Sequence, residues 1–269
     1  SDALGGAVNI ITNRSSKNYI DFSTSYGSFN TNKNAISTQL VNKKTGITLS
    51  LNGFTNYSKN NYKMKDVRGI IGDNIVDNKI TIDETSEFIT LDAKRFHNRY
   101  KSAFGQIELG VSNKKYADAL FANFSYTGFD QQLQTGTDQR NVYGMATKHG
   151  HSINTGIRYS KYDLFVNGLD VNSYWSYSKD ISIITDTARR KYYWNNIYAY
   201  NESPEIGSLF SINNITRPHI IGRTNISYKL NNEHSFNLNY VFDNVVNNNF
   251  NELVTNSDDN PGTVRKNLL

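Results

Sequence analysis

Apolar and polar residues alternate with a period of two along most of this chain. In a typical stretch, Leu120, Ala122 and Phe124 fall on one side of an extended strand, and Asn123 and Ser125 fall on the other. The alternation recurs in nine stretches, which predict strands over residues 18–29, 33–42, 46–58, 95–111, 119–134, 148–160, 164–179, 217–230 and 234–245. The chain is therefore expected to be all-β, with sheets that are apolar on one face only.

The predicted connections also alternate, between short and long. Short polar segments typical of hairpin turns lie at residues 42–46, 112–115, 160–163 and 231–233. Longer segments, predicted to be irregular, lie at about 60–93, 136–147, 180–216 and from 246 onward. The first joint, Asn30 to Asn32, is a short exception. Short turns at one end and long loops at the other are typical of an antiparallel transmembrane β-barrel of an outer membrane.

A soluble β-sandwich also alternates, but three features favour the membrane barrel. The predicted strands are roughly 10–17 residues long, whereas about 5–6 is usual. The polar face carries few apolar residues. Aromatic residues gather near the predicted strand ends, as in the interfacial girdles of barrels: Tyr26, Phe29, Tyr57, Tyr62, Tyr126, Phe129, Trp175 and Tyr177.

The amino-acid composition argues against several structural classes and partners. Aromatic residues make up 13% of the chain, which argues against disorder. The absence of cysteine excludes a disulfide framework and a thiolate metal site. The net charge is only +5 and the longest basic run is Arg189 to Lys191, so no nucleic-acid partner is expected. No apolar run approaches the ~20 residues of a transmembrane helix.

Nine strands do not make a bacterial single-chain barrel, in which the strand number is even and no sheet edge is left open in the lipid. The last residues, from Lys266 to Leu269, also suggest a further strand. We therefore expect this sequence to be a piece of a larger barrel, cut at both ends.

The opening segment carries the most specific motif. Two glycines permit a tight turn with close backbone approach, and Val8, Ile10 and Ile11 then suit a buried strand. The motif residues are Ser1, Asp2, Ala3, Leu4, Gly5, Gly6 and Asn9, within a segment that ends at Asn13. This segment resembles the end of the plug domain of TonB-dependent outer-membrane receptors, which stands directly before the first barrel strand. By itself, the motif would also fit any turn of small residues before a buried strand.

The resemblance implies a domain division and a function. Residues 1–17 would be the C-terminal end of the plug and its connector, and residues 18–269 about nine to ten strands of a 22-stranded barrel. Such a transporter imports a scarce nutrient of the ferric siderophore, haem or cobalamin class into the periplasm, using energy from the inner membrane. Its partners would be the TonB complex, reached through an N-terminal region outside this sequence, the lipid and lipopolysaccharide of a Gram-negative outer membrane, and a small-molecule ligand.

Two alternatives remain. A passive porin or adhesin barrel would contain no plug, so that residues 1–13 would form a linker. A soluble surface β-protein would pack Ile20, Phe22 and Leu238 inward against a second layer. In none of the three readings does the chain carry a catalytic constellation or a cofactor motif, and we expect no enzyme activity, no cofactor and no resident metal.

Two groups of residues are candidates for ligand contact. His149 and His151 share one face of a predicted strand at i, i+2, which suits a haem or metal contact, although two solvated histidines at a loop edge would look the same. The segment containing Arg189, Arg190, Tyr192, Tyr193 and Trp194 places cations beside aromatic rings, which suits a planar anionic ligand. Packing within the loop, or contact with lipopolysaccharide, would use the same residues. Acidic residues between Asp73 and Glu87 match no EF-hand spacing and are expected to be solvated.

Overall fold

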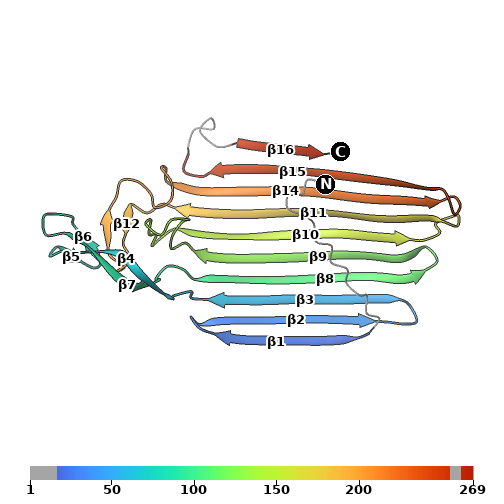
Figure 1. The fold of residues 1–269 in the computed structure, drawn as a ribbon, viewed down its shortest axis with the longest axis horizontal. Coiled ribbons are helices and arrows are strands. Elements are labelled where there is room, and N and C mark those ends of the chain that lie inside the picture. The colour runs from blue at the N-terminus through green and yellow to red at the C-terminus, as the bar shows by residue number, and fades with distance from the viewer. Residues whose placement is uncertain (1–16, 255–261, 269) are drawn as a thin grey trace.

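The computed structural model describes residues 17–254 and 262–268 and is all-β in this part of the chain. Ten strands form one antiparallel sheet in the order β1-β2-β3-β8-β9-β10-β11-β14-β15-β16 (Figure 1). These strands are β1 (Tyr19–Gly27), β2 (Thr31–Val41), β3 (Ile47–Ser58), β8 (Tyr100–Lys114), β9 (Ala117–Gln132), β10 (Thr147–Lys161), β11 (Leu169–Asp186), β14 (Ser211–Lys229), β15 (Ser235–Asn251) and β16 (Gly262–Leu268). Neighbouring strands of this sheet are consecutive along the chain, with two exceptions: four strands intervene between β3 and β8, and two intervene between β11 and β14. No helix in the described ranges is long and apolar enough to span a membrane.

The nine predicted strands are all present in the large sheet, with ends that differ by a few residues, and β16 is the tenth. The prediction was wrong about three of the long connections: the segment from 246 onward contains β16, and two others contain strands outside the large sheet. Residues 60–93 contain β4 (Lys63–Ile71), β5 (Ile75–Val76), β6 (Lys79–Ile80) and β7 (Glu87–Lys94), and residues 180–216 contain β12 (Arg190–Tyr192) and β13 (Tyr198–Tyr200). Strands β11, β14 and β15 also extend farther toward these connections than the alternation predicted. The motif residues Ser1, Asp2, Ala3, Leu4, Gly5, Gly6 and Asn9 lie outside the described residues.

Strand register places the apolar residues in continuous rows on one face of the sheet. One row runs across eight strands through Leu40, Leu49, Leu109, Ala122, Ile157, Trp175, Gly222 and Phe242. The adjacent row on the opposite face runs through Gln39, Ser50, Glu108, Asn123, Gly156, Ser176, Ile221 and Asp243. Because side chains alternate along a strand, the register keeps the two sets apart across the whole sheet. We call the two sides the apolar face and the polar face.

The apolar face has no second layer over it among the described residues. Ile20, Phe22 and Leu238 expose 70%, 69% and 62% of their surface, and Tyr240 is also exposed, whereas Leu49 is half-buried between its neighbours. A soluble sandwich would bury such side chains between two sheets at about 1.5–3 kcal/mol each. Within this part of the chain, that burial does not occur.

Long and short connections lie at opposite ends of the large sheet. Figure 1 shows the long connections gathered at one end of the sheet, which we call the loop end, and short turns at the other, the turn end. The exception is the turn between β1 and β2, which lies at the loop end. There Phe29 and Asn30 both have positive φ, and Thr31 N–H donates to Ser28 O at 3.3 Å, as in a type I′ hairpin.

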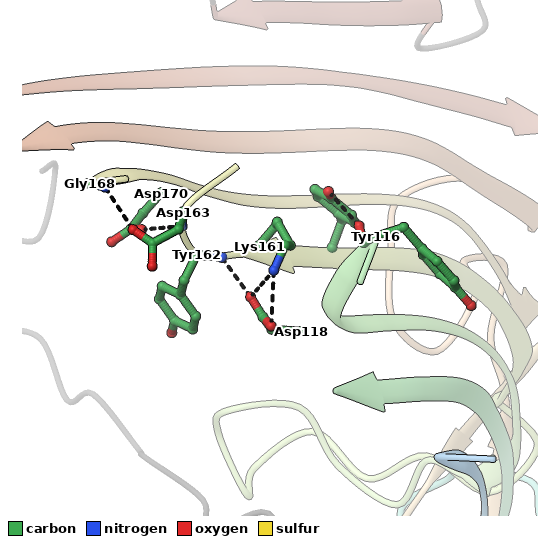
Figure 2. Close-up of polar contacts among 8 residues, drawn as sticks. Tyr116, Asp118, Lys161, Tyr162, Asp163, Gly168 and Asp170 are labelled. Carbon is green, nitrogen blue, oxygen red and sulfur yellow. Dashed lines mark hydrogen bonds and ion pairs between the residues drawn. The ribbon is translucent and has the colours of Figure 1, made fainter. Parts of the chain in front are cut away.

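Hydrogen bonds donated to carboxylates hold the turn between β10 and β11, which spans residues 162–168 and is longer than predicted (Figure 2). Asp118 accepts from the backbone N–H of Tyr162 at 2.6 Å and pairs with Lys161 Nζ at 3.3 Å. Asp163 accepts from the N–H of Gly168 at 2.7 Å. The acidic groups of this turn are therefore engaged within the protein.

Candidate functional site

Three long connections at the loop end fold together into one unit, which we call the loop assembly: residues 59–99, 133–146 and 187–210. Its backbone forms two small sheets, one pairing β4 with β7 and the other ordered β12-β13-β6-β5. The pairing of β13 with β6 is parallel and joins Tyr198 to Lys79, from two different connections. Figure 1 shows these strands beside the end of the large sheet. The loops are thus a folded structure.

Two apolar clusters form the interior of the loop assembly. The first contains Val67, Ala93, Val142, Tyr192 and Trp194, and the second contains Ile70, Ile80, Tyr193 and Ala199. Each cluster takes residues from at least two of the three connections. Since no connection has enough apolar surface to form a core alone, each depends on the others for its fold.

The buried side chain of Gln134 joins two connections of the loop assembly. Gln134 is almost fully buried, and its Oε1 accepts from the N–H groups of Phe96 and His97, both at 2.7 Å. Its Nε2 donates to Tyr143 O at 2.9 Å. A buried amide that satisfies both of its ends fixes the positions of the segments it joins.

Two carboxylates form a second set of links. Glu205 accepts from three consecutive backbone N–H groups, those of Gly144 and Ala146 at 2.7 Å and that of Met145 at 3.0 Å. Asp186, at the end of β11, in turn accepts from the N–H of Glu205 at 2.8 Å, and from those of Ile206 and Gly207. Together they connect β11, the 187–210 connection and the 133–146 connection through charge-assisted hydrogen bonds.

Burial shifts the protonation equilibria of two groups in this unit. Burial raises the pKa of the Glu205 carboxyl and the nearby Asp186 carboxylate raises it further, while the three N–H groups oppose the shift. Burial lowers the pKa of His97, whose Nε2 bonds to Ala146 O at 2.7 Å. Both groups sit where connections meet, so the loop assembly should respond to pH.

The predicted aromatic candidates lie inside the loop assembly. Tyr192, Tyr193 and Trp194 are all buried, with Trp194 only 2% exposed, and Trp194 Nε1 donates to Gln139 O at 3.0 Å. Packing within the loops accounts for these three rings, as in the second interpretation given above. Ligand contact by these three rings stays a prediction, and it would require the residues that cover the rings to move away.

The two arginines of that segment lie nearer the surface. The Arg189 guanidinium lies 4.8 Å from the ring centre of Phe210, and its Nη1 donates to Tyr200 Oη at 3.4 Å. The Arg190 guanidinium lies 4.3 Å from the ring centre of Tyr198 and donates to Tyr192 Oη at 3.1 Å. Aromatic rings thus hold both cations in place.

His149 and His151 lie on β10 near the loop end, both exposed, and they share one face as expected. The face is the apolar one, and the His151 ring stacks on Tyr126 with ring centres 6.1 Å apart. This position is away from the polar face. Among the described residues, no group of three or more histidine or acidic side chains has a geometry that would hold a metal ion.

The acidic residues of the 59–99 connection mostly point outward, and Asp83 orders its own turn. Asp83 accepts from the N–H of Thr85 at 2.9 Å and from the Thr85 hydroxyl at 2.7 Å. These bonds lower the pKa of Asp83. The carboxylate therefore stabilises the turn between β6 and β7.

Neither a scan against models of protein families nor a search of curated proteins finds a match for this chain.

Proposed function

We propose that this chain belongs to a TonB-dependent transporter of a Gram-negative outer membrane, and that it forms the end of the plug and the first part of the barrel. The observation that carries the proposal is the separation of the two faces. A row of mostly apolar residues crosses the sheet with no layer over it among the described residues, and the adjacent row on the other face is mostly polar. A sheet that contacts lipid on one side and a polar interior on the other needs this separation.

The dimensions of the apolar face support a membrane position. Along β9 it runs from Leu120 to Tyr126, roughly 20 Å at about 3.4 Å per residue. Outer-membrane barrels have an apolar band about 25 Å tall, bordered by aromatic residues. In the proposal, further strands outside this sequence join β16 to β1, because an open edge in lipid would leave backbone groups unpaired.

The polar face provides a surface for a plug. Arg158, Asn172, Arg223 and Asn239 on this face supply charged and amide groups, and they line a groove of about 450 Å³ whose lining also includes Tyr159 and Tyr240 of the apolar face. Arg158 also pairs with Glu108 at 3.8 Å. In the proposal the polar face is turned toward the plug, and hydrogen-bonding groups on both surfaces allow the plug to separate from the wall when it is pulled.

The loop assembly supports a role in ligand capture. Its two cores and the backbone hydrogen bonds accepted by Asp186 and Glu205 give it a fixed shape over the loop end. Preformed loops bind a small molecule with less loss of conformational entropy than loops that order on binding. The ligand, of the ferric siderophore, haem or cobalamin class, then passes between plug and wall into the periplasm without chemical change.

Energy coupling rests on the resemblance of residues 1–13 to the end of a plug. The test uses the full-length protein produced in its Gram-negative host. We expect it in the outer-membrane fraction, and we expect growth on a scarce ligand of one of the three classes to depend on both this protein and TonB. Growth that persists without TonB would indicate a passive barrel, and recovery of the protein only in soluble fractions would overturn the proposal.

A further inference from the structure

The turn end carries the same tripeptide, Asn-Lys-Lys, in two neighbouring turns. Asn42-Lys43-Lys44 joins β2 to β3, and Asn113-Lys114-Lys115 lies where β8 turns into β9. Since β3 pairs with β8, the two turns are adjacent. The N–H of Ser112 donates to Gly46 O at 3.1 Å, and a Cβ built on Gly46 would lie 3.2 Å from Lys114 Cε. The two turns thus place four lysines along one stretch of the turn end.

The first of these turns is held rigidly. Gly46 has a φ of +71°, and its N–H donates to Asn42 O at 2.7 Å. The Asn42 side chain accepts from the N–H groups of Lys44 and Thr45 at 3.0 and 3.2 Å. Lys43 and Lys44 are therefore presented outward from a fixed backbone, and both are exposed.

The positive charge of the two turns has no counterpart within the described chain. Residues 40–49 and 111–117 contain no acidic residue. Ion pairs join other lysines to carboxylates in the described ranges, but none of them involves these four lysines. Asp118, the nearest acid in sequence, is already bound to Lys161 and to the Tyr162 N–H (Figure 2).

An apolar hollow lies directly beside the lysines. It has a volume of about 530 Å³, and its lining includes Leu40, Ile47 and Leu49 from the apolar face together with Lys43 and Lys44. Leu40 and Ile47 are exposed. The hollow is thus apolar on the side of the strands and cationic at the turn.

We propose that this hollow and the four lysines bind an acidic phospholipid, with the phosphate against the lysine ammonium groups and an acyl chain against Leu40, Ile47 and Leu49. The inference rests on the proposed membrane function, in which the turn end lies at the inner leaflet and the apolar face contacts lipid. Charge complementarity selects an acidic headgroup over a zwitterionic one. The other turns at this end lack the feature, because residues 162–168 and 230–234 contain Asp163 and Glu233.

The test uses the full-length protein, purified in a neutral detergent, with phosphatidylglycerol and phosphatidylethanolamine as probes in native mass spectrometry. The variant replaces Lys43, Lys44, Lys114 and Lys115 with glutamine. The matched control replaces four exposed lysines of the loop assembly, Lys59, Lys65, Lys79 and Lys191, with glutamine.

We expect the wild-type protein and the control to retain phosphatidylglycerol in preference to phosphatidylethanolamine. The turn variant should bind phosphatidylglycerol at least about tenfold more weakly, because each lysine near an anionic lipid surface contributes severalfold to binding. Glycerol 1-phosphate at the same concentration should not displace the lipid, since it has no acyl chain to fill the hollow.

Three results would overturn the inference: equal retention of the two lipids by the wild-type protein, equal losses in the turn variant and the control, or displacement by glycerol phosphate. In each of these cases the protein would still fractionate with the outer membrane. Failure of the proposed function would be distinct, because the wild-type protein would then be absent from that fraction.

Discussion

The indole of Trp175 lies over Gly222, its register partner on the neighbouring strand β14. A Cβ added to Gly222 would lie 2.6 Å from two ring carbons of Trp175, and the same ring stacks on Phe242 with centres 6.0 Å apart. The glycine therefore leaves the space into which the indole packs, so that a flat aromatic surface spans β11, β14 and β15 on the apolar face.

Replacing Gly222 with alanine should displace Trp175, because a methyl group and a ring carbon do not approach to 2.6 Å. Overpacking of this kind costs about 1–3 kcal/mol. We expect a lower midpoint of urea unfolding for Gly222→Ala in the full-length protein. Gly105→Ala is the control, because a Cβ there would meet no atom within 4 Å. Equal midpoints for the two variants would show that Trp175 moves without cost.

The loop assembly should depend on the Glu205 carboxylate. Glutamine at this position has only one acceptor oxygen, so Glu205→Gln leaves at least one of the N–H groups of Gly144, Met145 and Ala146 facing an amide NH₂. Each buried N–H group left without an acceptor costs about 1–3 kcal/mol. We expect faster hydrogen exchange at these three amides and faster proteolysis of residues 133–146, while the large sheet stays folded.

The exposed Glu202, three positions away, provides the matched control for this variant. Glu202→Gln should leave the exchange rates at Gly144 to Ala146 unchanged. If Glu205→Gln does the same, the carboxylate does not hold the 133–146 connection.

Much of the large sheet was predictable from the sequence, because a period of two is imposed by strand geometry at each residue. The alternation assigns Asn123 and Phe124 to opposite faces of the sheet, although the sequence does not show what covers either face. The loop assembly was not predictable in this way, since its contacts join distant parts of the chain. Tyr192 and Trp194 read as surface aromatics because the residues that cover them, Val67 and Val142, come from two other connections.

The carboxylate links of Asp186 and Glu205 escaped the sequence analysis for the same reason. Glu205 binds N–H groups that lie 59 to 61 positions earlier in the chain. Backbone donors leave no pattern in the sequence, so no residue type near Gly144 signals a carboxylate partner. A partly buried glutamate in a predicted loop becomes recognisable only when the three connections are seen together.

The stability of the loop assembly should fall on mild acidification because of His97. Its pKa in the folded protein is lowered, so the unfolded segment, with a pKa near 6.5, takes up a proton first as the pH falls. The contribution of His97 is therefore fully present above about pH 6.5 and is lost as the pH falls from there toward the lowered pKa of the folded state. Glu205 acts in the opposite direction, because its raised pKa favours the folded state as the carboxyl protonates.

The two effects are separable with His97→Gln. Glutamine retains an N–H donor for Ala146 O but does not titrate. Hydrogen exchange of the loop assembly, followed between pH 7.5 and 5.5, should accelerate more in the wild-type protein than in the variant, once corrected for intrinsic exchange rates. Parallel profiles for the two proteins would exclude His97 as the titrating group.

The division into faces makes opposite predictions for two adjacent residues of β9. Phe124 is exposed on the apolar face, whereas Ser125 lies on the polar face between Gln106 and Asn154. Arginine on the lipid side of a barrel destabilises it by about 2–4 kcal/mol near the middle of the bilayer. We expect Phe124→Arg to lower the free energy of unfolding by this amount for the full-length protein in lipid vesicles, as measured by guanidinium titration.

Ser125→Arg places the same charge one residue away, next to polar neighbours, and should change the free energy of unfolding by less than about 1 kcal/mol. The sign of the difference is the decisive outcome, because a protein with its polar face outward would lose more stability from Ser125→Arg than from Phe124→Arg.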